Sequence, residues 1–510
     1  MIAAALPVAV VIALTGCTGG GGDEGSTAPR SRSSQSPSGD VTSGPASVWE
    51  QTVEWERCTV TTGAQCATVL APLDWADPEG ETIELALARV EATDSDQRIG
   101  SLVINPGGPG GSGKSYLGSI LPRIGAEVRE RFDIVGFDPR GVGDSSAVTC
   151  YKTTAERDAY YAATWPKTVE GLAESVDVVK PFADACAANT GPLLGHVDTI
   201  SSAKDMDLLR ALLGDEKLNF LGFSYGTFLG ATYAELFPQN VGRMVLDGAL
   251  DPSVSADLHE VEQAAGFEAA LDAYLDDCLA GSYCPFSGTK AEALEEIHEA
   301  LKEIQAKPIA IPDGDGRDLT APLAINGIVV TLYDDLTWSL LTTALFDLLD
   351  EGDGSYLLWL SDLYLERSLG QYSSNQMEAF IAINCLDARL SADPAAVEKH
   401  ARDLAAASPT IGEFWSYSEM QCEVWPYPQV GEPHPVSAPG AEPIIVIGTT
   451  GDPATPYQGA LALAEQLESS VLITFEGEGH TAYGRSNDCV EGAVDRYLVD
   501  GTPPTQDLTC

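Results

Sequence analysis

One glycine-flanked serine constrains this chain more than any other feature. The stretch from Lys217 to Gly230 reads as an apolar strand, a sharp turn and a helix that Pro238 ends. Its centre, Gly222-Phe-Ser224-Tyr-Gly226, matches G-x-S-x-G, in which a strained strand-to-helix turn lifts a serine hydroxyl above a sheet. Ser224 could instead only fill a tight turn, but the flanking strand and helix favour a nucleophile.

Strands and helices alternate on both sides of this turn. Strands are predicted at 82–90, 99–105, 132–137, 244–247, 443–448 and 471–475. Such alternation predicts an α/β fold with a mainly parallel sheet. Residues 251–440 are largely helical instead, which predicts a helical cap inserted after the sixth core strand. The expected core therefore comprises residues 49–250, of which 49–71 read as irregular, and residues 441–510.

The N-terminus predicts export. Residues 2–14 form an apolar run shorter than a membrane span, and Leu14-Thr-Gly-Cys17 ends it like a bacterial lipobox. Residues 1–16 are then a signal peptide, Cys17 a lipidation site, and residues 17–48 a flexible linker rich in Gly, Ser, Thr and Pro. The expected location is the outer face of a bacterial cell membrane, or the medium. A plain secretory signal with an incidental Cys17 is the alternative.

The charge excludes two classes of partner. The chain has 28 Lys and Arg residues against 76 Asp and Glu residues, a formal net charge of -48. This charge repels nucleic acid and anionic membrane surfaces, so we expect no nucleic-acid partner and membrane contact only through a lipid anchor. Its main effect is solubility, but it also attracts cationic groups such as free amino termini.

The cysteines favour disulfides. Removing Cys17 from the 11 cysteines leaves ten, an even number in an exported chain. The sequence contains no C-x-x-C pair of the kind that would indicate a zinc site. We therefore expect neither a metal nor a cofactor. Proximity in the sequence suggests the pairs Cys58 with Cys66, Cys150 with Cys186, Cys278 with Cys284, Cys385 with Cys422, and Cys489 with Cys510.

A glycine-rich loop follows the predicted strand at 99–105. Residues 108–115 formally match the phosphate-binding pattern G-x-x-x-x-G-K-[ST]. We reject this interpretation because an exported protein has no ATP supply and Pro109 removes one N–H donor. The loop instead predicts an oxyanion hole formed by the backbone N–H groups of Gly108 and Tyr225, with an ordinary tight turn as the alternative.

A nucleophilic serine needs an imidazole to take its proton and a carboxylate to orient that imidazole. Asp452 follows the predicted strand at 443–448, and His480 follows the strand at 471–475. The order Ser224, Asp452, His480 is typical of α/β-hydrolases. Asp247, at the end of an earlier strand, is the competing acid, although the glycine and prolines around Asp452 favour the later residue.

Four motifs together resemble those of a known family. They are Pro106-Gly-Gly-Pro-Gly110, Gly222-Phe-Ser-Tyr-Gly226, Gly451-Asp-Pro-Ala-Thr-Pro456 and Gly479-His480, and the resemblance spans residues 49–510. They look like the motifs of the secreted tripeptidyl-aminopeptidase branch of the prolyl-aminopeptidase-like serine peptidases. Pro106 departs from them, since many relatives carry histidine there. The resemblance implies an α/β-hydrolase fold and an exopeptidase that releases tripeptides, other short peptides or single residues from a free N-terminus through an acyl-enzyme.

Such an enzyme would take peptide substrates and would need a site for the substrate ammonium. Asp387 and Glu423 in the cap are candidates, brought together if Cys385 pairs with Cys422, although a solvated or helix-capping role is equally compatible. An esterase or lipase of the same fold is the second hypothesis. A non-catalytic binding lipoprotein is the third, against which the complete set of Ser, Asp and His argues. The oligomeric state stays open.

Overall fold

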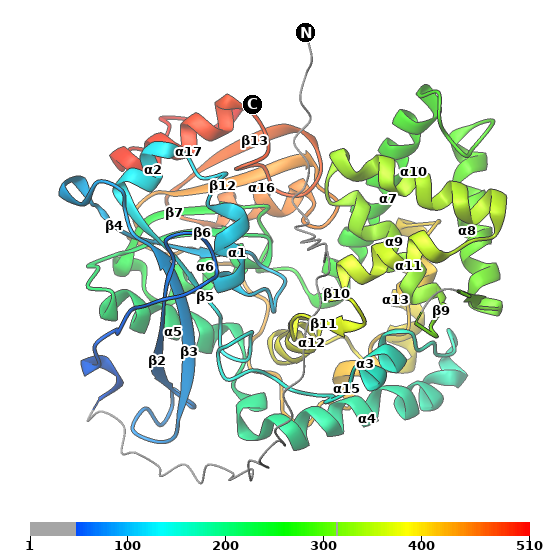
Figure 1. Ribbon diagram of the computed structural model, residues 1–510, viewed down its shortest axis with the longest axis horizontal. Coiled ribbons are helices and arrows are strands. Elements are labelled where there is room, and N and C mark those ends of the chain that lie inside the picture. The colour runs from blue at the N-terminus through cyan, green and yellow to red at the C-terminus, as the bar shows by residue number, and fades with distance from the viewer. Residues whose placement is uncertain (1–46, 313–314) are drawn as a thin grey trace, which may run out of the picture. The chain divides into compact units, whose positions relative to one another are not determined.

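The computed structural model describes residues 47–312 and 315–510, and one ten-stranded sheet organises them (Figure 1). The strands are β1 (Glu56–Arg57), β2 (Gln65–Pro72), β3 (Thr82–Val90), β4 (Gly100–Asn105), β5 (Phe132–Phe137), β6 (Leu218–Phe223), β7 (Val241–Asp247), β12 (Ile444–Gly451), β13 (Ser470–Glu478) and β14 (Leu508–Thr509). Their order is β1-β2-β3-β5-β4-β6-β7-β12-β13-β14. Only the pairings of β1 with β2, β2 with β3 and β3 with β5 are antiparallel. The predicted α/β-hydrolase fold with a mainly parallel sheet is confirmed.

Helices cover both faces of the sheet. One face packs on α5 (Thr199–Leu212), α6 (Tyr225–Leu236) and α16 (Tyr457–Gln466). The other face packs on α1 (Gly113–Ile120), α2 (Ala126–Arg131) and α17 (Asp488–Asp500). All residues of β4 and β5 are consequently buried, as expected for parallel strands covered on both sides. The carboxyl ends of these strands form one edge, where the loops that carry the site begin.

The N-terminal part of the core is more regular than the sequence predicts. Residues 49–71 read as irregular, yet 65–72 form β2, which pairs with β3 along its whole length. Val69 and Ala71 are fully buried in this strand. The prediction was wrong because the buried face of β2 carries mostly small side chains, which give a weak alternating signal.

The cap lies between β7 and β12, and most of its buried apolar side chains form a core separate from those of the sheet. Its helices are α7 (Ala256–Ala280), α8 (Lys290–Ala306), α9 (Ala321–Leu332), α10 (Trp338–Phe346), α11 (Ser355–Tyr364), α12 (Gln376–Asp387), α13 (Pro394–Ala407), α14 (Gly412–Trp415) and α15 (Met420–Glu423). Two small hairpins that the sequence did not predict accompany them. They are formed by β8 (Ile309–Ala310) with β9 (Asp318–Leu319), and by β10 (Arg367–Ser368) with β11 (Gln371–Tyr372).

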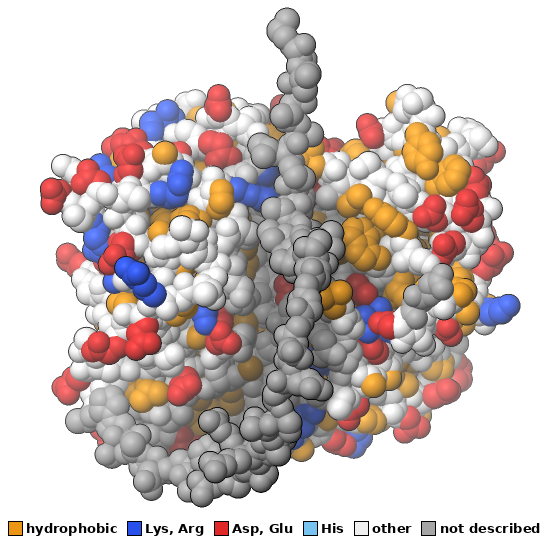
Figure 2. All heavy atoms as spheres, in the orientation of Figure 1, with side chains coloured by type: hydrophobic (Ala, Val, Ile, Leu, Met, Phe, Trp, Pro, Cys, Tyr) orange, Lys and Arg blue, Asp and Glu red, His pale blue; other side chains and the backbone are white. Residues whose placement is uncertain are grey.

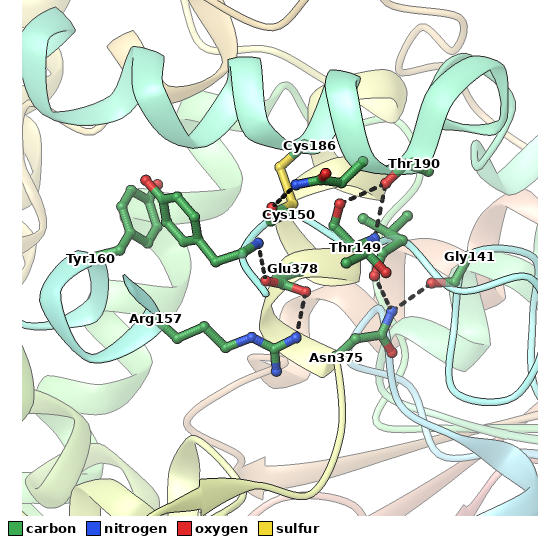
Figure 3. The surroundings of a disulfide bond; sticks show 12 residues. Gly141, Thr149, Cys150, Arg157, Tyr160, Cys186, Thr190, Asn375 and Glu378 are labelled. Atoms are coloured by element: carbon green, nitrogen blue, oxygen red, sulfur yellow. Dashed lines mark hydrogen bonds and ion pairs between the residues drawn. A yellow bond between two sulfur atoms is a disulfide. The ribbon is translucent and has the colours of Figure 1, made fainter. Parts of the chain in front are cut away.

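An earlier segment of the chain also contacts the cap. It contains α3 (Thr154–Tyr161) and α4 (Leu172–Thr190), which lie beside α15 at the lower edge of the cap in Figure 1. Figure 3 shows how it is held: Arg157 Nη2 donates to Glu378 Oε2 of α12 at 3.1 Å, beside the disulfide between Cys150 and Cys186. This segment, which the sequence assigns to the core at 49–250, thus contacts the cap helix α12, while Phe182, Ala183 and Cys186 of α4 pack in the same apolar cluster as the sheet.

The five expected disulfides are all present, which confirms the predicted pairing. Acidic side chains are spread over the visible face of both core and cap, with few basic ones between them (Figure 2). No helix in the described part of the chain is long and apolar enough to cross a membrane. The predicted signal peptide, Cys17 and nearly all of the linker lie outside the described residues.

Candidate active site

Ser224 sits on a strained turn between β6 and α6. Its backbone has φ 56° and ψ -127°, a region that residues other than glycine rarely adopt. The Ser224 N–H donates to the carbonyl oxygen of Asp247 at 2.9 Å, which ties the turn to the end of β7. A Cβ at Gly222 would lie 2.5 Å from the carbonyl oxygen of Gly226, so a larger residue at 222 would prevent this turn. Both glycines of the motif thus serve its geometry.

Asp452 and His480 are paired at the ends of β12 and β13. His480 Nδ1 lies 2.9 Å from each carboxylate oxygen of Asp452. The Asp452 side chain has no solvent exposure and also accepts hydrogen bonds from the N–H groups of Thr455 and Thr481, at 2.8 and 3.0 Å. A carboxylate held in this way fixes the ring so that Nε2 is the nitrogen left to act as a base.

His480 and Ser224 line the same cavity. No hydrogen bond joins Ser224 Oγ to His480 within the described residues. Such contacts are often long in a free enzyme and shorten when substrate binds. The arrangement brings the three residues of the predicted Ser, Asp, His set to one place.

Asp247, the competing acid, occupies a different position. Its fully buried carboxylate accepts hydrogen bonds from the N–H groups of Ala482, at 3.0 Å, and Tyr483, at 2.7 Å. Burial raises the pKa of Asp247 to about 7. The carboxylate therefore anchors the loop just beyond His480, and the acid that bonds the imidazole is Asp452.

The glycine-rich loop approaches the serine turn closely. A Cβ at Gly107, which has φ 91°, would lie 2.5 Å from the carbonyl oxygen of Phe223. The Gly107 N–H already donates to Asn105 Oδ1 at 2.9 Å. Gly108 and Tyr225, the two predicted oxyanion donors, both line the cavity with Ser224. The amide of Gly107 is therefore occupied and is not available to a reacting carbonyl.

The geometry also argues against a phosphate cradle in this loop. Asp138 Oδ1 accepts hydrogen bonds from the Ser112 hydroxyl and the Lys114 N–H, 2.5 and 3.1 Å away at the start of α1. The Lys114 ammonium pairs with Asp144. A carboxylate thus already occupies the helix N-terminus that a phosphate would need.

The cap contributes directly to the position of His480. The His480 N–H donates to the carbonyl oxygen of Tyr333 at 2.7 Å, and the two rings meet edge to face with centroids 5.3 Å apart. Arg485 bridges the same boundary, since Nη2 donates to Asp335 Oδ1 of the cap at 3.0 Å and Nη1 to the carbonyl oxygen of Thr481 at 3.1 Å. Sequence reasoning missed both contacts because no local pattern marks a bond between segments about 150 residues apart.

The two predicted ammonium-binding residues, Asp387 and Glu423, lie in different surroundings in the structure. Asp387 lines the cavity, but its two oxygens accept from the N–H and the hydroxyl of Thr199, at 2.8 and 2.6 Å. The same hydroxyl bonds Tyr225, so Asp387 supports the residue next to the serine. Burial raises the pKa of Asp387 to about 7. Glu423 is exposed and lies outside the cavity lining, which does not support its assignment, although the Cys385–Cys422 disulfide forms.

The cavity between core and cap is acidic. Its volume is about 740 Å³, a size typical of a ligand site. Seven carboxylates line it, and no Lys or Arg side chain stands among its described lining residues. The seven are Glu235, Asp251, Glu260, Glu366, Asp387, Glu419 and Glu432. Such a lining attracts a cationic ligand.

Comparisons with known proteins agree with this geometry. Residues 408–510 match the family model described as TAP-like protein. The chain is 39% identical to the serine protease Hip1 of Mycobacterium tuberculosis, with 90% of this chain and 91% of the relative covered. It is 37% identical to carboxylesterase B of the same species, over 88% and 86% of the two chains. Its identity to the tripeptidyl aminopeptidase of Streptomyces lividans is 30%, over 90% and 86%.

Proposed function

Because this chain belongs to the TAP-like family of α/β-hydrolases, we propose that it is an exported serine exopeptidase that releases short peptides, such as tripeptides, from the free N-terminus of its substrates. The observation that carries the proposal is the pairing of His480 with Asp452 in the same cap-covered, acidic cavity as Ser224. A covered cavity favours chain ends over chain middles. Its carboxylates favour an end that carries an ammonium group.

The proposed chemistry begins with proton transfer from Ser224 Oγ to His480 Nε2 while Oγ attacks the scissile carbonyl carbon. The N–H groups of Gly108 and Tyr225 hold the oxyanion, and Asp452 stabilises the imidazolium. His480 then gives its proton to the leaving amine, and the C–N bond breaks to leave an acyl-enzyme. Water, deprotonated by the same imidazole, attacks the ester and releases the peptide.

The test compares substrates that differ only at the amine. Tripeptidyl coumarin amides with free and acetylated N-termini are hydrolysed by the wild-type protein, and kcat/KM is measured for each. A charge-assisted contact worth about 1.5–3 kcal/mol should make the free amine better by one to two orders of magnitude, about 10-fold to 100-fold. Equal cleavage of both substrates contradicts an exopeptidase.

An esterase is the second candidate, and the named carboxylesterase relative supports it. The same serine, imidazole and oxyanion donors can hydrolyse an ester. A panel of p-nitrophenyl esters measured beside the peptides separates the two functions. An esterase would hydrolyse the best ester with a higher kcat/KM than any peptide in the panel and would not distinguish free from acetylated amines.

The lipid anchor is a further part of the proposal. The lipobox-like sequence Leu14-Thr-Gly-Cys17 supports it, together with the five disulfides that suit an extracellular compartment. Expressed in a bacterium that processes lipoproteins, the full chain should partition into detergent. Cys17→Ala should lose this partitioning or stay unprocessed, whereas equal behaviour of the two forms would contradict lipidation and leave a plain secretory signal.

A further inference from the structure

Glu260 and Glu419 of the cap line one wall of the cavity, and His400, which is outside the lining, contacts both. His400 of α13 places Nδ1 3.0 Å from Glu419 Oε1 and Nε2 3.7 Å from Glu260 Oε2. Among the described residues, neither Glu419 Oε2 nor His400 Nε2 has a hydrogen-bond partner, although both atoms are buried. The Glu419 side chain is only 1% exposed and lines the cavity. Buried polar atoms without partners are rare in proteins, so this wall is suited to a ligand that donates hydrogen bonds.

The charges around this wall favour a cationic ligand. Burial opposes protonation of His400, but its hydrogen bond to Glu419 and the charge of Glu260 raise its pKa above the usual value, so one cation faces these two carboxylates. Asp257 adds a third negative charge near Glu260, which leaves the group acidic. The nearby ammonium of Lys167 already donates to the carbonyl oxygens of Phe414 and Ser416, at 2.9 and 2.6 Å. Burial raises the pKa of Glu260 to about 7 in the free protein. A bound cation would favour its ionised form, and a primary ammonium supplies three N–H donors.

A smaller chamber adjoins the same wall. Its volume is about 220 Å³, and it shares Glu260, Gln263, Tyr333, Tyr364 and Ser418 with the main cavity. Its other lining residues are Phe267, Asn326, Val329 and Trp415. Phe267 and Trp415 meet edge to face with centroids 5.5 Å apart. The chamber walls are therefore mainly aromatic and aliphatic, with a carboxylate at the junction of the two cavities.

We infer that the N-terminal residue of the substrate is seated at this junction, with its ammonium on Glu260 and Glu419 and a large apolar side chain in the smaller chamber. The inference rests on the proposed function. The ammonium and the side chain are bonded to the same Cα, so an ammonium beside Glu260 places the side chain at the mouth of the chamber that Glu260 lines. Asp387 suits the ammonium less well, because both its oxygens already accept from Thr199.

The ammonium half of the inference is tested with Glu419→Gln against Glu423→Gln. Glutamine keeps the size of the side chain and can still accept from His400, but it removes the charge. Glu423, four residues further on, is exposed outside the cavity and serves as the matched control. The ratio of kcat/KM for free over acetylated tripeptide amides should fall about 10-fold to 100-fold in Glu419→Gln, mainly through KM, and stay at the wild-type value in Glu423→Gln. Equal ratios in the two variants would overturn this assignment.

The chamber half is tested with tripeptide amides that carry Phe or Gly at the N-terminus. The wild type should prefer Phe by about 10-fold or more, since burial of an aromatic side chain in an apolar chamber is favourable. Val329→Phe and, separately, Asn326→Phe fill the chamber and should bring the Phe-to-Gly ratio close to one. Thermal melting verifies that each variant is folded. If one of the two variants does not fold, the other still shows whether filling the chamber removes the preference for Phe.

A matched series varies instead the residue after the scissile bond, in tetrapeptides with a constant N-terminal tripeptide. If the chamber-filling variants change selectivity in this series and leave the N-terminal preference intact, the chamber serves the leaving group and the inference is overturned. The proposed function fails by a different result, namely that the wild type itself cleaves free and acetylated substrates equally. If the wild type discriminates but Glu419→Gln discriminates equally well, only the further inference fails.

Discussion

The backbone N–H of His480 donates a hydrogen bond of 2.7 Å to the carbonyl oxygen of Tyr333, and this bond joins the core to the cap. Tyr333 directly follows α9, which is packed in the apolar core of the cap. The imidazole that pairs with Asp452 is therefore held from both sides. A cap in this position does more than cover the cavity, because the orientation of the imidazole depends on it.

Arg485 is expected to act as a positioning residue at this boundary. It bonds the carbonyl oxygens of Glu478 and Thr481, on either side of His480, and the cap carboxylate of Asp335. Arg485→Ala should lower kcat about 10-fold to 100-fold, since small displacements of catalytic groups are costly. A small p-nitrophenyl ester should be affected as strongly as a peptide, with KM little changed.

Arg485→Lys supplies the matched comparison, because it keeps the charge and loses the fork of donors. It should restore part of kcat. A loss confined to KM for peptides, with ester hydrolysis intact in Arg485→Ala, would instead mean that Arg485 shapes the substrate path and does not position His480.

The two buried acids should differ sharply on substitution. Asp452→Asn leaves the ring beside an amide and favours the wrong tautomer, so kcat should fall by roughly 10⁴ with the fold retained. Asp247→Asn can still accept from the N–H groups of Ala482 and Tyr483 through its amide oxygen, and should lose much less. Steady-state kinetics of both variants on one peptide substrate decide the matter; the reverse ranking would assign the catalytic acid to Asp247.

Asp247 should also make the free energy of unfolding depend on pH. Burial raises its pKa from 3.8 to about 7 in the folded protein, which means that the folded state binds more protons than the unfolded state between these values. The free energy of unfolding that Asp247 contributes is thus present at low pH and lost as pH rises towards 7. Asp247→Asn lacks this dependence.

Urea unfolding at several pH values measures the effect. Relative to the wild type, the unfolding free energy of Asp247→Asn should rise between about pH 4 and about pH 7 and level off above that. A difference that stays constant over this range would mean that the Asp247 carboxyl titrates in the folded protein as it does in the unfolded chain.

The disulfide between Cys385 and Cys422 joins α12 to α15 across a sequence separation of 37 residues. Loop-closure entropy assigns such a crosslink about 4 kcal/mol, against about 2.5 kcal/mol for Cys58–Cys66, whose separation is 8. Replacing both cysteines of each pair by alanine and measuring unfolding in urea should show the larger loss for the Cys385–Cys422 pair. A larger loss for Cys58–Cys66 would show that local packing outweighs loop length here.

Local patterns were sufficient to predict the core and its nucleophile turn. The strand, the glycines and the helix around Ser224 are contiguous, and Asp452 and His480 each follow an apolar strand directly. The disulfides could be predicted from spacing, since each pair is separated by 37 residues or fewer. Features of this kind depend on residues that are close together in the sequence.

Contacts between distant segments could not be predicted in this way. The bond from His480 to Tyr333 and the pairing of His400 with Glu260 and Glu419 leave no periodic signal. The place of Glu423 beside Cys422 suggests a site residue, but the direction in which a one-turn helix such as α15 presents its side chains depends on packing. The contact of Arg157 in the segment 154–190 with Glu378 of α12 likewise leaves no local signal.

The central claim is that Ser224 is the nucleophile, and labelling with a biotinylated fluorophosphonate tests it most directly. Intact mass and peptide mapping of the wild-type protein should show one adduct, on Ser224, that forms in step with the loss of peptidase activity. Ser224→Ala should fold, as its melting curve can verify, and take up no label. An adduct on the Ser224→Ala variant, or one on another residue of the inactivated wild type, would contradict the account.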